Sequence, residues 1–93
     1  MRLKDGYLLK EIMDEYVLFP SGQNVVDGKK IVSLNESGVF IAKHLQNDIP
    51  YKSLLKLFLD EYEATTDEEI EMLQFDLDHF LDNLWRRDML ITD

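Results

Sequence analysis

The feature that most constrains this chain is a change in the spacing of its apolar residues near Leu34. Before Leu34, short apolar runs separated by turn-forming residues predict strands. After it, apolar residues recur every three or four positions, which predicts helices. Because the chain has 93 residues, we expect one domain, residues 1–93, around a single core.

Three apolar runs predict a three-stranded antiparallel sheet in chain order: Tyr7 to Met13, Tyr16 to Phe19 and Ile31 to Leu34. Asp14-Glu15 separates the first two runs, and a connection from Gly22 to Gly28 precedes the third. The second run is continuously apolar, which is typical of a central strand covered on both sides. The first and third strands are therefore expected to be edges.

The two expected edge strands differ in charge. Proteins usually protect an edge with charge, proline or a bulge. The first strand carries Lys10 and Glu11, whereas Ile31 to Leu34 carries no charge. The third strand is therefore predicted to be an open template for another chain, unless a helix or a second copy of the protein covers it.

Three helices are predicted after Leu34. Asn35 suits the N-cap of a short first helix, and Pro50 suits the first turn of the second. Thr66 to Glu69 has the form of a capping box and opens a helix from about Asp67 to Arg87, followed by an extended tail, Met89 to Ile91. The predicted fold class is α+β, winged-helix-like, with an N-terminal three-stranded sheet followed by three helices. The apolar stripe of the third helix is Ile70, Leu73, Leu77, Phe80, Leu81 and Leu84.

Composition argues against catalysis and against cofactors. The chain has no cysteine and two histidines, so thiolate chemistry, disulfides and the common zinc and iron-sulfur ligand sets are missing. No nucleophile elbow or phosphate loop is present. We therefore expect a protein that is not an enzyme and binds no metal or cofactor. No apolar run is long enough for a membrane span, and charged residues near Met1 do not suit a signal peptide, so we expect a cytoplasmic protein.

Charge argues against nucleic acid as a partner. The chain has ten basic and nineteen acidic residues, a formal net charge of -9. Residues 67 to 83, which would form the recognition helix of a winged-helix regulator, hold seven acidic residues and no Lys or Arg. Such a helix would be repelled by phosphates. A DNA-binding function is therefore disfavoured.

Four segments carry a resemblance to a known family: Lys4-Asp5-Gly6-Tyr7, Tyr16 to Pro20, Ile31 to Gly38, and Asp76-Leu77-x-x-Phe80-Leu81-x-x-Leu84. Together they resemble the family of coenzyme pyrroloquinoline quinone (PQQ) synthesis protein D, the small peptide recognition elements of ribosomal peptide maturation. The resemblance covers nearly the whole chain.

Two positions depart from the family. Lys29-Lys30 replaces a turn pair that is often Asn-Gly, and Asp88 stands where the family usually has glycine. Since Asp tolerates a left-handed backbone better than most residues, we expect the end of the helix to survive this change.

The resemblance implies a non-catalytic module that binds the leader of a ribosomally synthesised precursor peptide. Such a module presents the leader to a modifying enzyme, often a radical S-adenosylmethionine (SAM) enzyme. In the family, the leader adds as an extra strand beside the third strand, with side chains in a groove next to the third helix. The alternatives are a winged-helix transcriptional regulator and a structural dimerisation module.

The candidate peptide-binding residues come from the third strand and the third helix. On the helix, Met72, Phe75 and His79 cluster away from the core stripe, so they predict either the peptide groove or a homodimer contact. If the groove instead follows one flank of the stripe, Asp76, Phe80 and Asn83 are its predicted lining. The strand contributes Lys30, Ile31, Val32, Ser33 and Leu34.

Overall fold

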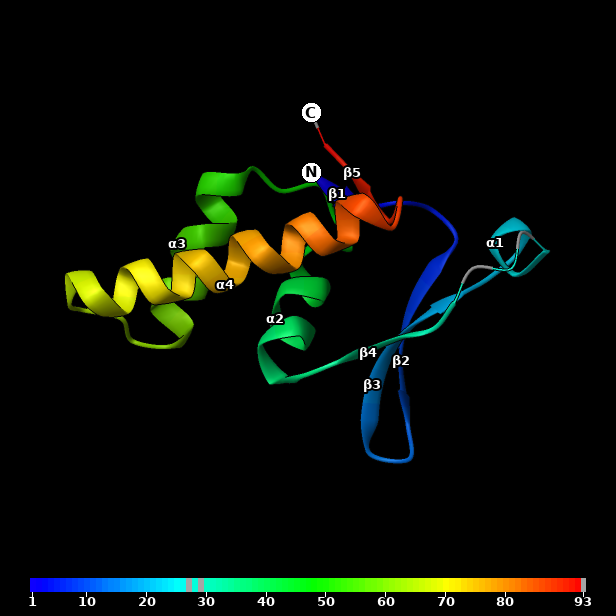
Figure 1. Ribbon diagram of the computed structural model, residues 1–93, viewed down its shortest axis with the longest axis horizontal. Helices are drawn as coiled ribbons and strands as arrows, with labels where there is room; N and C mark the ends of the chain where they lie inside the picture. Colours follow the sequence, from blue (N-terminus) through cyan, green and yellow to red (C-terminus); the bar gives the residue numbers. More distant parts are fainter. Residues whose placement is uncertain (27, 29, 93) are drawn as a thin grey trace.

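A computed structural model describes residues 1–26, 28 and 30–92 (Figure 1). Lys29, one half of the Lys29-Lys30 pair, lies outside the described residues. The expected α+β arrangement is confirmed, with a three-stranded antiparallel sheet followed by three helices. The sheet has the order β2-β3-β4. These elements are β2 (Tyr7–Ile12), β3 (Glu15–Pro20), β4 (Val32–Leu34), α2 (Glu36–His44), α3 (Tyr51–Glu61) and α4 (Asp67–Arg86).

A two-residue turn joins β2 to β3. Met13 and Asp14 both have positive φ, 50° and 68°, which is the backbone of a type I′ hairpin turn. Ile12 pairs directly with Glu15. The prediction that Met13 ends the strand and that Asp14-Glu15 forms the turn is therefore wrong by one residue. The reason is that a primed two-residue turn matches the twist of the strands and fixes this register.

β4 pairs with the central strand over three residues, Tyr16↔Leu34, Val17↔Ser33 and Leu18↔Val32. The predicted start at Ile31 is wrong by one residue. Two positions further along this register, Pro20 would stand opposite Lys30. Because proline has no N–H to donate, the ladder ends before that pair.

The connection between β3 and β4 contains a short helix that the sequence pattern did not predict. This helix, α1 (Gln23–Val26), follows Gly22 and precedes Gly28. Both glycines have left-handed backbones, with φ of 57° and 75°. Their conformational freedom allows the chain to reverse direction at each end of α1.

Helix ends follow the sequence signals closely. The Asn35 side chain accepts the Gly38 N–H at 2.9 Å, so the predicted N-cap of α2 is confirmed. Thr66 and Glu69 form the predicted capping box of α4. Pro50 is the N-cap of α3 and does not lie in its first turn. Asp88, just past the end of α4, has a φ of 58° and so adopts the expected left-handed conformation.

The first and last described segments pair with each other. β1 (Arg2–Leu3) and β5 (Leu90–Ile91) form a two-stranded antiparallel sheet beside the C-terminal end of α4 (Figure 1). The extended tail was predicted, but this pairing was not. Within the described residues, no helix is long and apolar enough to cross a membrane.

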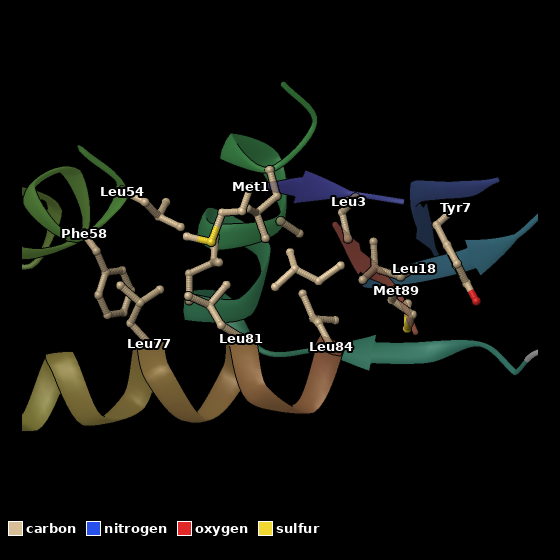
Figure 2. Packing of buried hydrophobic residues seen from close by; sticks show 14 residues of the cluster. Met1, Leu3, Tyr7, Leu18, Leu54, Phe58, Leu77, Leu81, Leu84 and Met89 are labelled. Atoms are coloured by element: carbon tan, nitrogen blue, oxygen red, sulfur yellow. The ribbon is translucent and has the colours of Figure 1, made fainter. Parts of the chain in front are cut away.

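The core lies mainly among α2, α3 and α4, and Tyr7 and Leu18 extend it onto one face of the sheet. Figure 2 shows Leu77, Leu81 and Leu84 projecting from α4 toward residues of the sheet and of α3. Leu73 and Phe80, also in the predicted stripe, are partly buried against the same cluster. α4 is therefore packed against the core on one face. The largest fully buried side chains are Leu18, Ile41, Leu45, Leu54, Phe58, Leu77, Leu84 and Met89.

Candidate functional site

The direction of backbone groups along the sheet can be assigned from one hydrogen bond. The Ser21 N–H donates to the Gly6 carbonyl at 2.8 Å, and these residues continue the register of Tyr7↔Pro20. Pairs in an antiparallel ladder alternate between hydrogen-bonded and non-hydrogen-bonded. Counting from this pair makes Ile12↔Glu15 a hydrogen-bonded pair, which agrees with a two-residue turn closing directly after it.

The same alternation fixes which residues of β4 face outward. In β3, Tyr16 and Leu18 direct their backbone groups toward β4, so their partners Leu34 and Val32 form the hydrogen-bonded pairs. Ser33 lies between them and directs its N–H and C=O to the other side. No strand pairs with that side of β4 among the described residues. Among the described residues no strand covers the expected open edge, and Ser33, which is exposed, is its central residue.

Among the hollows lined by β4 or by the residues next to it, two are also lined by α4 or by the residues just after α4. The first, which we call the acidic hollow, has a volume of about 320 Å³. The three residues predicted to line a groove along the flank of the apolar stripe, Asp76, Phe80 and Asn83, all line this hollow. His79 lines it as well. Its lining residues are Asn35, Ser37, Asp76, His79, Phe80 and Asn83.

The second hollow, which we call the basic hollow, has a volume of about 220 Å³. It brings the predicted residues Lys30 and Val32 together with Arg87, which the sequence analysis did not place in the site. A signal was available, because Arg87 follows Asn83 by four residues and so shares its helix face. The lining residues are Tyr7, Gly28, Lys30, Val32, Arg87 and Met89.

The other predicted helix residues lie outside both hollows. The Met72 and Phe75 side chains are 59% and 69% exposed. The Phe75 ring stacks on the His79 ring, with the centroids 5.9 Å apart. His79 thus connects the acidic hollow to an exposed apolar surface on the first half of α4.

Two predicted strand residues have side chains that serve other contacts. Ile31 is 51% exposed and lines a hollow on the outer face of the sheet with Ile12 and Val17. Leu34 packs against the core. Leu34 also lines a further hollow with Ser33, and neither Ile31 nor Leu34 lines the acidic or the basic hollow.

Gly38 sets the shape of the acidic hollow, a role that the sequence analysis missed. A Cβ at this position would lie 3.0 Å from Phe80 Cε2 and 3.1 Å from Asn35 Oδ1. Both distances are tighter than ordinary van der Waals contact. The absence of a side chain at Gly38 therefore lets the start of α2 approach α4 and positions Phe80.

The two hollows carry opposite charge. Asp76 lines the acidic hollow, whereas Lys30 and Arg87 line the basic one. No ion pair among the described residues involves Lys30 or Arg87. Burial, with a smaller contribution from Asp88, raises the pKa of the Tyr7 phenol, which therefore remains a neutral O–H group at neutral pH. The basic hollow thus offers two cations and a hydroxyl donor.

The described residues offer no grouping of three or more His, Cys, Asp or Glu side chains that could hold a metal ion. Comparison of the chain with protein-family models, with curated proteins and with solved structures gives no significant match. The geometry of the β4 edge and the hollows beside it is therefore the basis for a functional proposal.

Proposed function

We propose that this protein is a peptide-binding module that captures an extended segment by strand addition at the β4 edge. The observation that carries this proposal is the outward direction of the Ser33 backbone groups, on a strand that has the basic hollow beside its first residue and the acidic hollow beside its last. An added strand would satisfy the N–H and C=O of Ser33 and place alternate side chains toward α4. Backbone pairing supplies affinity, and the hollows supply selectivity.

The balance of energies favours side-chain anchors over backbone pairing. Each strand hydrogen bond contributes about 1 kcal/mol net, whereas one well-buried apolar anchor contributes about 2 kcal/mol. Ordering a flexible peptide takes back about 2 to 5 kcal/mol. Because β4 is only three residues long, binding depends mainly on what enters the two hollows. The resulting affinity suits temporary capture.

The resemblance to the family of PQQ synthesis protein D supports a more specific role. In that role, the peptide is the leader of a ribosomally synthesised precursor, and the module presents it to a radical SAM enzyme in the cytoplasm. The module itself performs no chemistry on the peptide. Its function is to hold the leader while the enzyme acts on the rest of the precursor.

A second candidate function is a contact with another copy of the chain. The exposed Met72 and Phe75 side chains favour it, because they lie outside both hollows on one face of α4. Light scattering of the parent and of a Met72→Ser/Phe75→Ser variant distinguishes the two cases. A dimer in the parent and a monomer in the variant would support the homodimer contact.

The test of peptide capture is an amide NMR titration with a synthetic leader of a precursor peptide encoded beside this protein. We expect shift changes to concentrate on residues 30–35 and on residues 76–87. Ser33→Pro should keep its fold by circular dichroism and lose these changes, because proline removes only the outward N–H. If Ser33→Pro folds and binds the leader as tightly as the parent, strand addition at this edge is wrong.

A further inference from the structure

The opposite charges of the two hollows indicate that the β4 edge selects for the charge order of its peptide. The acidic hollow lies beside the C-terminal end of β4, at Asn35, and the basic hollow lies beside Lys30, on the N-terminal side. A peptide that adds to this edge passes both. Its two ends therefore meet surfaces of opposite sign.

The distance between the hollows corresponds to a fixed spacing in the peptide. Up to Arg87, an α-helix rises about 16 Å from Asp76 and about 10 Å from Phe80, and four residues of strand, at about 13 Å, lie between these two values. Side chains of a strand alternate between its two faces, so residues i and i+4 point in the same direction. One peptide can therefore place side chain i in the acidic hollow and side chain i+4 in the basic hollow.

The register agrees with this spacing. Val32 and Leu34 face the helices, and Lys30 shares their parity and lines the basic hollow beside Val32. If a peptide residue pairs with Ser33, the residue before it lies opposite Leu34 and the residue three positions after it lies opposite Lys30. Those two peptide residues are four apart.

Pairing direction decides which charge comes first. Every described strand pair in this protein is antiparallel, and antiparallel pairing is slightly more stable per residue than parallel pairing. An antiparallel peptide begins near Asn35 and ends near Lys30. It therefore meets Asp76 before it meets Lys30 and Arg87.

We propose that the β4 edge binds, in antiparallel orientation, peptides that carry a basic residue at position i and an acidic residue at position i+4. The basic side chain enters the acidic hollow, with its stem on Phe80 and its charge near Asp76. The acidic side chain pairs with Lys30 and Arg87. This inference rests on the proposed function. A peptide of reversed charge order would face like charges at both ends, which disfavours it.

A selection from a displayed library of short random peptides tests the proposal. The protein is used as the parent, as Lys30→Glu/Arg87→Glu and as Lys52→Glu/Lys56→Glu. The last variant makes the same change in charge at exposed residues of α3 that do not line either hollow. Peptides selected by the parent and by the α3 variant should share a basic residue and, four positions later, an acidic one. The Lys30→Glu/Arg87→Glu variant should lose the acidic preference at that position.

Titration calorimetry with one synthetic peptide from the parent selection gives the magnitude. Replacing its acidic residue by lysine should weaken binding to the parent by about tenfold or more, and Lys30→Glu/Arg87→Glu should recover part of that loss. If the α3 variant changes the selection as much as Lys30→Glu/Arg87→Glu does, net charge alone is responsible and the inference is wrong.

The two proposals fail in different ways. The parent could select peptides that lack the charge spacing but no longer bind when Ser33 is replaced by proline. In that case the inference on charge order is wrong, and the proposal of peptide capture is supported. If every selected peptide binds Ser33→Pro as tightly as the parent, peptide capture at this edge is wrong, and the inference on charge order is wrong as well.

Discussion

The two edges of the sheet show how differently one protein can treat equivalent positions. β2 has six residues, all paired with β3, and presents Lys10 and Glu11 in its second half. β4 has three residues, carries no charge and lies between two hollows. Charged side chains on β2 discourage another strand from adding there. An edge strand is therefore suited to peptide binding when it carries no charged side chains and when a neighbouring surface can bind the side chains of the peptide.

The largest expected effect on stability comes from comparing proline at the inward-facing and the outward-facing N–H positions of β4. Val32→Pro removes the N–H of a hydrogen-bonded pair with Leu18, which should lower the free energy of unfolding by about 2 to 3 kcal/mol. Ser33→Pro removes only an outward-facing N–H, so its free energy of unfolding should fall by less than about 1 kcal/mol. Urea unfolding monitored by circular dichroism measures both. Equal stability of the two variants would show that the assigned parity is wrong.

Gly38→Ala tests whether the acidic hollow belongs to the binding edge. The new Cβ would crowd Phe80 and the Asn35 cap, so the free energy of unfolding should fall by about 1 to 2 kcal/mol. Peptide affinity should fall as well, because Phe80 lines the hollow. A matched Gly22→Ala variant has open space around its Cβ but a left-handed backbone, so it should lose stability without losing affinity. Unchanged affinity in a folded Gly38→Ala variant would separate the hollow from binding.

Glu11→Pro makes the corresponding change on the opposite edge. Glu11 pairs with Tyr16 at a non-hydrogen-bonded position, so its N–H points away from β3. The variant should lose less than about 1 kcal/mol of stability and bind the leader peptide like the parent. NMR titration alongside Ser33→Pro measures the contrast. Loss of binding in Glu11→Pro with an intact fold would mean that the protected edge also takes part.

The smallest expected effect concerns the ion pair between Lys4 and Asp88, the residue that follows Arg87. The hydrogen bond that the Lys4 ammonium donates to Asp88 at 2.7 Å raises the pKa of Lys4. A raised pKa in the folded state means that this pair supports stability below the ordinary lysine pKa and loses that support as pH rises through the folded value. Asp88→Asn should lower the pKa of Lys4, as followed by NMR. An unchanged Lys4 pKa would contradict the role of this pair.

Much of the fold could be predicted because its signals are local. The change of apolar spacing near Leu34 and the Thr66 capping box identified the sheet, its order and the main helices. The Met13-Asp14 turn was misplaced because it lacks the Asn-Gly or Asp-Gly pair that usually marks a type I′ turn. Pairing of β1 with β5 involves two residues on each side, too few to form a pattern.

The site could be predicted only in part, because it depends on how distant segments meet. The third strand was identified as an open edge, but the outward direction of Ser33 follows from hydrogen-bond alternation that begins at Gly6 and Ser21. Helix spacing allowed two faces of α4, and only packing against the start of α2 distinguishes Asp76, Phe80 and Asn83 from Met72 and Phe75. The contact that decides it is made by Gly38, which has no side chain to suggest one.

Pro20 bears on turnover as well as on architecture. By ending the ladder at Val32, it keeps the template short. A longer template would add hydrogen bonds to every bound peptide regardless of its side chains, and affinity gained in this way acts mainly by slowing dissociation. A short template leaves residence time under the control of the two hollows. For a module that passes its peptide to an enzyme and then accepts the next, one imino acid in the central strand thus favours rapid exchange over tight retention.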